Sequence, residues 1–87
     1  MTSIKNPSMD NASNTIASRI HYLRTRIAGL TRTDFAQKLG SKPVNIAILE
    51  RGIRKPSTKL LDKFQQVYDV NINWLLTGTG NVLIEKI

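Results

Sequence analysis

Residues 30–52 read LTRTDFAQKLGSKPVNIAILERG, and this stretch decides the fold. Its first half predicts a short helix that is capped by Thr31 or Thr33 and that ends at Gly40, because glycine is favoured just past a helix C-terminus. The inner face of this helix carries apolar residues at helical spacing: Phe35, Ala36 and Leu39. A tight turn must follow at once.

The second half of the stretch predicts another short helix, which begins at Lys42 or Pro43, extends to Arg51 and is closed by Gly52. Proline is tolerated at its start because the first N–H groups of a helix have no intrahelical partner. Two short helices joined by a tight turn suggest DNA binding, in which the second helix enters a major groove about 12 Å wide.

One further helix is predicted before this stretch. It can be capped by Asn14 or Thr15, and Gly29 ends it. Its apolar residues recur at steps that follow one helix face: Ile16, Ile20, Leu23 and Ile27.

Two more helices are predicted after the stretch. The first opens at residues 56–58, and its apolar side consists of Leu60, Leu61, Phe64, Val67 and Tyr68. The second begins at Asn71 or Asn73 and carries Ile72, Trp74, Leu75 and Leu76. A turn then leads to an apolar end over residues 82–87, which could form a short strand. The predicted fold class is therefore all-α, with five short helices around one core.

The chain divides into three parts on this pattern. Residues 1–14 are polar and without periodicity, and they are predicted to be a disordered arm. Residues 15–80 form the predicted domain, and residues 81–87 form an apolar tail that serves dimerisation or acts as a linker. A chain of 87 residues has room for one such domain and no interdomain cleft.

The residue inventory argues against an enzyme and against a metal or cofactor. Cysteine is absent, His21 is the one histidine, and the six acidic residues form no pair at a spacing suited to acid–base work. No apolar run approaches the roughly 20 residues that span a bilayer, and the start of the chain lacks the apolar stretch of a signal peptide. A soluble, cytoplasmic protein without a small-molecule substrate is expected.

Charge gives the first positive indication of function. The net charge is +7, and residues 19–63 alone hold eleven basic and three acidic residues, a net charge of +8. Such a concentration in the folded part suggests a polyanionic partner. Double-stranded DNA is favoured over a membrane surface, because the apolar helix faces are used in mutual packing.

Four segments together resemble the phage repressor and Cro-type (XRE, lambda-repressor-like) helix-turn-helix family. They are residues 30–40, residues 46–52, residues 54–57 and the ending DVNINWLLTG at residues 69–78. The resemblance covers about residues 16–80, and it implies a compact five-helix domain that binds DNA. It also implies that Ala36, Gly40, Ile46 and Leu49 are packing positions.

The family pattern assigns Glu50 a structural role, as the partner of an arginine in the first helix. Arg24 is the candidate for this ion pair. However, the segment from Arg24 to Gly29 is one residue longer than the usual pattern, so Thr25 could take the aligned position instead.

The resemblance also implies which residues face DNA. The predicted base-reading residues are Arg32, Lys42, Val44, Asn45 and Ile48. Asparagine can bond both N6 and N7 of adenine, which makes Asn45 the best candidate for direct readout. Val44 and Ile48 could press against thymine methyl groups or face a protein partner instead. The predicted phosphate contacts are Thr31, Arg32, Arg51, Arg54, Lys55 and Lys59.

One such domain reads few base pairs, so a homodimer on a pseudo-palindrome is expected. The predicted dimerisation residues are Trp74, Leu75, Val82, Leu83 and Ile84. A transcriptional repressor of phage type is the favoured function, and a protein antirepressor is a plausible further partner. The alternatives are an antitoxin, a restriction–modification controller, or an interaction module that no longer reads DNA specifically.

Overall fold

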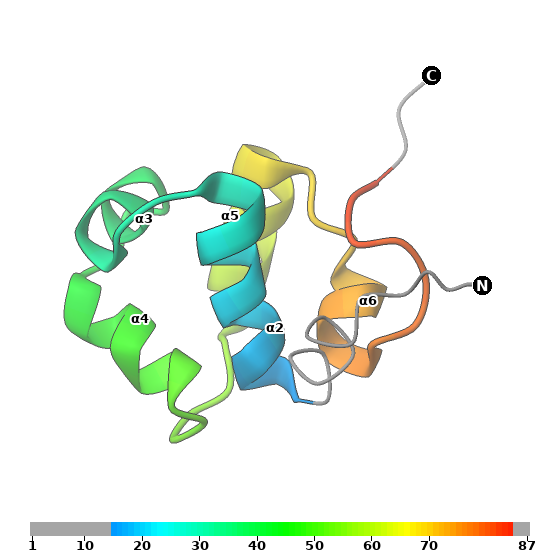
Figure 1. Ribbon diagram of the computed structural model, residues 1–87, viewed down its shortest axis with the longest axis horizontal. Coiled ribbons are helices and arrows are strands. Elements are labelled where there is room, and N and C mark those ends of the chain that lie inside the picture. Colours follow the sequence, from blue (N-terminus) through cyan, green and yellow to red (C-terminus); the bar gives the residue numbers. More distant parts are fainter. Residues whose placement is uncertain (1–14, 85–87) are drawn as a thin grey trace.

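A computed structural model describes residues 15–84, in which short helices are joined by loops and turns (Figure 1). The helices are α2 (Ile16–Tyr22), η1 (Leu23–Ala28), α3 (Arg32–Lys38), α4 (Pro43–Glu50), α5 (Thr58–Tyr68) and α6 (Ile72–Thr77). Because η1 continues α2 directly, the two form the predicted first helix, and the all-α, five-helix prediction is confirmed. The predicted arm, residues 1–14, and residues 85–87 lie outside the described part. Between residues 15 and 84, no helix has the length and apolarity needed to cross a bilayer.

Polar side chains fix where four of the helices begin. Thr15, Thr31, Ser57 and Asn71 each accept a hydrogen bond from a backbone N–H in the first turn of the following helix. Such caps satisfy N–H groups that would otherwise have no partner. The predicted alternatives are thereby resolved in favour of Thr15, Thr31 and Asn71.

The first helix changes register at η1, which is a π-helix. The extra residue widens the turn, and Ile27 is 37% exposed whereas Ala28 packs against the core. The prediction that Ile27 shares the apolar face of Leu23 is therefore wrong. The Thr25 hydroxyl donates to the His21 carbonyl over 2.8 Å, a side-chain bond to the preceding turn that is common where helices are distorted.

The core draws on every helix, and its most deeply buried members include Ile20, Phe35, Ile46, Phe64 and Leu75. The Phe35 ring lies 6.0 Å from Phe64 and 5.5 Å from Tyr68, centroid to centroid. These aromatic contacts join α3 to α5, so α3 is held against the rest of the domain.

Trp74 and Leu75 are core residues, which corrects their assignment to a dimer surface. Their exposed fractions are 3% and 0%, because α6 turns this side toward α2. The side chain of Arg19 on α2 is also buried, and its Nε donates to the Leu75 carbonyl over 2.7 Å. A second chain cannot reach these side chains in the folded domain.

The predicted tail is hydrogen-bonded to the domain as far as Ile84. The Asn71 N–H donates to the Val82 carbonyl over 2.8 Å, and the Ile84 N–H donates to the Asp69 carbonyl over 2.7 Å. Val70 and Leu83 form an isolated antiparallel bridge, so the suggested strand is reduced to a single bridge. Val82 packs against the core, while Leu83 and Ile84 remain exposed.

Candidate nucleic-acid interface

The turn between α3 and α4 brings these two helices into direct contact. Gly40 has φ +67°, a left-handed conformation that favours glycine, and the Ser41 N–H donates to the Ala36 carbonyl over 2.8 Å. Ala36 is fully buried beside the turn. This packing fixes how α4 projects from the domain.

Helix α4 is apolar on both its buried and its exposed side. Ile46 and Leu49 face the core, at 0% and 5% exposure, whereas Val44 is 58% exposed. Ile48 is half-buried, and Lys42 is exposed at the N-cap position. An apolar residue on the outer face of a short helix is available for contact with another molecule, because the core does not use it.

Asn45 lies at one edge of the exposed side of α4. It is half-buried, and its Nδ2 donates to the Ser41 hydroxyl one turn earlier over 3.3 Å. This bond uses one of the two amide hydrogens. The second amide hydrogen and the carbonyl oxygen Oδ1 have no hydrogen-bond partner within residues 15–84.

A hollow of about 260 Å³ lies between α4 and the start of α5. Its apolar wall is formed by Leu39, Ile48, Leu49 and Leu60. Its cationic wall is formed by Arg54, Lys55, Lys59 and Lys63. Asn45 borders the same hollow, and no carboxylate lines it. The structure thus brings the predicted base-reading residues Asn45 and Ile48 together with three of the predicted phosphate contacts.

Lys63 is a cation at this hollow that the sequence analysis missed. It stands one helical turn after Lys59 on α5, and it is half-buried whereas Lys59 is exposed. Spacing of four residues on a predicted helix places two side chains on one face, which is the signal that could have identified it.

Arg51 lies apart from this group. It borders a second hollow beside the start of α2, together with Thr15 and Ser18, and Arg54 and Lys55 line both hollows. The predicted phosphate contacts after α4 therefore extend along two surfaces. Thr31 uses its hydroxyl to cap α3.

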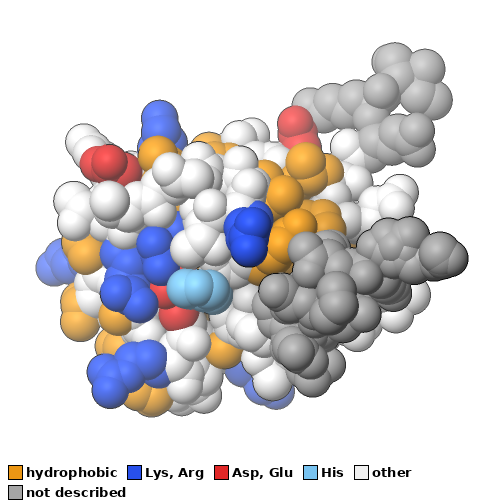
Figure 2. All heavy atoms as spheres, in the orientation of Figure 1, with side chains coloured by type: hydrophobic (Ala, Val, Ile, Leu, Met, Phe, Trp, Pro, Cys, Tyr) orange, Lys and Arg blue, Asp and Glu red, His pale blue; other side chains and the backbone are white. Residues whose placement is uncertain are grey.

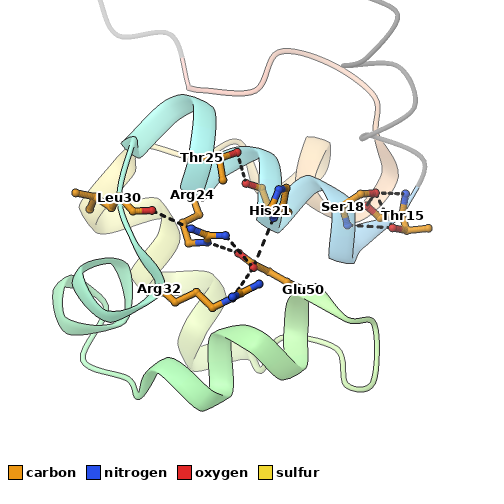
Figure 3. Close-up of polar contacts among 8 residues, drawn as sticks. All are labelled: Thr15, Ser18, His21, Arg24, Thr25, Leu30, Arg32 and Glu50. Carbon is orange, nitrogen blue, oxygen red and sulfur yellow. Dashed lines mark hydrogen bonds and ion pairs between the residues drawn. The ribbon is translucent and has the colours of Figure 1, made fainter.

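Glu50 connects several elements at the end of α4 (Figure 3). Arg24 Nε donates to its Oε2 over 2.6 Å, and Arg24 Nη2 donates to its Oε1 over 3.3 Å. Arg32 Nε also donates to Oε1, over 3.0 Å. His21 Nδ1 lies 3.6 Å from the same oxygen. In this structure the first-helix residue that pairs with Glu50 is Arg24, and not Thr25.

The environment of Glu50 favours its ionised form. Burial, which leaves its side chain 3% exposed, would by itself raise the pKa of this carboxyl. The hydrogen bonds and positive charges of Arg24 and Arg32 outweigh burial and hold the pKa below its usual value. Glu50 is therefore a carboxylate at neutral pH, between two arginines.

Positive charge is concentrated at the α3 and α4 end of the molecule. Figure 2 shows Lys and Arg side chains over that half of the visible face, together with acidic side chains and the histidine. Arg32, Arg51, Arg54, Lys55 and Lys59 are all exposed. The described surface thus presents an apolar helix face with cations on both flanks.

The comparisons with known proteins agree with this geometry. Residues 20–75, well over half of the chain, match a family model described as helix-turn-helix. The match extends from α2 to α6 and includes the whole of α3, the turn and α4. No curated protein and no solved structure matches the chain.

Proposed function

The chain belongs to the XRE and Cro-type helix-turn-helix family of DNA-binding regulators, and on this premise we propose that it is a phage-type repressor that binds a pseudo-palindromic operator as a homodimer. The observation that carries the proposal is the exposed side of α4. Val44 is 58% exposed there. Arg32 of α3 is exposed and bonded to the end of α4, and Arg54 and Lys55 are exposed between α4 and α5. DNA combines apolar methyl groups in the major groove with phosphates on both sides.

Base reading is proposed to centre on Asn45. Its unused amide hydrogen and Oδ1 can pair with N7 and N6 of adenine. Val44 and Ile48 would contact thymine methyl groups, and Lys42 at the start of α4 would reach a neighbouring base. Arg32 would contact the base edges only if its guanidinium extends beyond the phosphate that it meets first.

Phosphate contacts are proposed for two groups of residues. Thr31 and Arg32 would meet the backbone at the start of α3. The second group lies after α4 and consists of Arg51, Arg54, Lys55 and Lys59. We include Lys63 in this group because it lines the same hollow as Arg54, Lys55 and Lys59. These contacts would position the domain without reading sequence.

Dimerisation is proposed to use the exposed end of the described chain. Leu83 and Ile84 are each 37% exposed although both are large and apolar, and Val82 beside them packs inward. A second copy that covers Leu83 and Ile84 would remove this surface from water. Two domains would then occupy two half-sites and exclude polymerase or another regulator from the operator.

Selection from a random duplex DNA pool tests the proposal. The salt concentration is about 150 mM, at which weak non-specific binding is suppressed. We expect the wild-type protein to enrich a two-fold symmetric motif. Asn45→Ala should lose discrimination at one position per half-site, by about 1 to 3 kcal/mol, while Gln66→Ala, an exposed α5 residue that does not line the hollow, should keep the wild-type motif.

A protein-interaction module is the second candidate, because Ile53 is 68% exposed and lies just after the apolar helix α4. For such a module, the DNA selection would enrich no motif, and DNA binding would weaken steadily as the salt concentration rises. That result would end the repressor proposal and favour a protein partner on α4.

A further inference from the structure

Arg24 and Arg32 both bind the carboxylate of Glu50. They differ in how many of their guanidinium nitrogens are already hydrogen-bonded within the domain. Arg24 binds both oxygens of Glu50, and its Nη1 donates to the Leu30 carbonyl over 3.0 Å. Its side chain is 11% exposed. All three nitrogens of Arg24 are thus engaged inside the domain.

Arg32 touches Glu50 through Nε alone, over 3.0 Å, and its side chain is 48% exposed. Within residues 15–84, its Nη1 and Nη2 have no hydrogen-bond partner. A guanidinium has a fixed fork geometry, so a bond at Nε restricts the directions in which Nη1 and Nη2 can point. The two terminal nitrogens form the edge that binds phosphate oxygens in pairs.

The group formed by Glu50, Arg24 and Arg32 has one negative and two positive charges. The carboxylate is matched by the two-bond contact with Arg24, and with 3% exposure it presents almost no negative surface to an approaching anion. His21 also faces Oε1, at 3.6 Å, and adds no negative charge. Two arginines and one carboxylate sum to a net charge of +1, and Arg32 is the exposed member of this group, so an approaching phosphate meets positive charge there.

We propose that Glu50 is a positioning residue for DNA binding: it holds Arg32 by Nε so that Nη1 and Nη2 grip one backbone phosphate as a preformed pair of donors. This inference rests on the proposed DNA-binding function and assigns Glu50 a second task beside its ion pair with Arg24. Helix α3 begins at Arg32, and α4 ends at Glu50, so the contact also links both helices of the motif to the DNA backbone (Figure 3). Ordering the side chain before binding removes part of the entropy cost of the contact.

The test is a salt titration of binding to one fixed duplex, because phosphate contacts do not depend on sequence. The variants are Arg32→Gln and Arg32→Lys, with Arg26→Gln on η1 as a matched loss of an exposed charge. Arg32→Gln should lower the slope of log K against log salt by about 0.9. Arg32→Lys should keep the slope yet bind roughly tenfold more weakly, since an ammonium group cannot hold carboxylate and phosphate in one fixed fork.

Glu50→Gln, checked for folding by circular dichroism, completes the test. It should weaken binding in the wild-type background and have no effect in the Arg32→Gln background. Equal weakening in both backgrounds, or an Arg32→Lys variant that binds as tightly as wild type, would overturn the inference. If Glu50→Gln does not fold, an Arg32→Lys variant that binds as tightly as wild type still overturns the inference. The motif selection with wild-type protein tests the proposed function separately.

Discussion

Glu50 joins three helices through one buried charge. Its partners Arg24 and Arg32 come from η1 and α3, and Glu50 itself ends α4. Removing one member of a buried ion pair leaves the other charge without a partner, which costs roughly 3 kcal/mol. The carboxylate thus stabilises the relative placement of the helices that form the candidate interface.

Acid should remove this stabilisation. The pKa of Glu50 is lower in the folded protein than its usual value of 4.5, so the folded state favours the carboxylate. Its contribution is complete above the unfolded pKa and is lost as pH falls through the lower folded pKa. We expect the gap in unfolding free energy between wild type and Glu50→Gln to be constant above about pH 5 and to shrink below it. Urea denaturation at several pH values measures the gap, with Asp62→Asn as control, and a gap that persists at low pH would contradict the assignment.

Residue roles were predictable where the motif assigns them and unpredictable where this chain departs from it. The family pattern implied an ion pair between Glu50 and the first helix, but spacing left Arg24 and Thr25 open, and the structure shows Arg24. The contact of Arg32 with the same carboxylate was not predicted, because Arg32 was expected to face DNA alone. Trp74 and Leu75 were misplaced because an apolar pattern does not say whether a face meets the core or another chain.

At the scale of elements, capping residues made the helix starts predictable to within a residue or two. Thr31 and Ser57 combine a side-chain acceptor with an apolar pattern that begins directly after it. The excess residue between Arg24 and Gly29 was visible in the sequence, but its effect on the backbone was not. A helix can absorb an insertion by widening one turn or by shifting its later residues, and tertiary packing decides between these.

Deleting Ile27 should therefore be tolerated. Ile27 is 37% exposed, and its removal places Ala28 four residues after Leu23, on the inward face of an ordinary α-helix. We expect a melting temperature equal to or above that of wild type, measured by circular dichroism. Deleting Leu23, which is 2% exposed, serves as the control and should abolish cooperative unfolding. Loss of folding on deletion of Ile27 would mean that the π-helix is required.

For the whole molecule, charge and size predicted one basic domain and apolar periodicity predicted that it is helical. The placement of its apolar surfaces could be determined only from the folded chain. The last described residues return to the α5–α6 corner, where Leu83 bridges Val70. Exposed Leu83 and Ile84 are consequently held at one defined place on the domain.

The dimer proposal makes these two residues the place to test. We expect Leu83→Glu with Ile84→Glu to shift the protein from dimer to monomer in sedimentation equilibrium, because two charges would be buried without partners. Binding to a palindromic operator should weaken while binding to a single half-site stays unchanged. Ile53→Glu also places a charge at an exposed apolar position. It is the control that shows whether any such charge changes the molecular mass measured by sedimentation. An unchanged dimer mass in the double variant would place the interface elsewhere.

The return of the chain beside α6 has a practical consequence. In Figure 1 the described C-terminal segment lies at the opposite end of the molecule from α3 and α4. A fluorescent protein joined to the C-terminal end would thus be attached far from the helix that is proposed to read DNA. Individual molecules could then be followed by light microscopy as they arrive at and leave a tethered duplex.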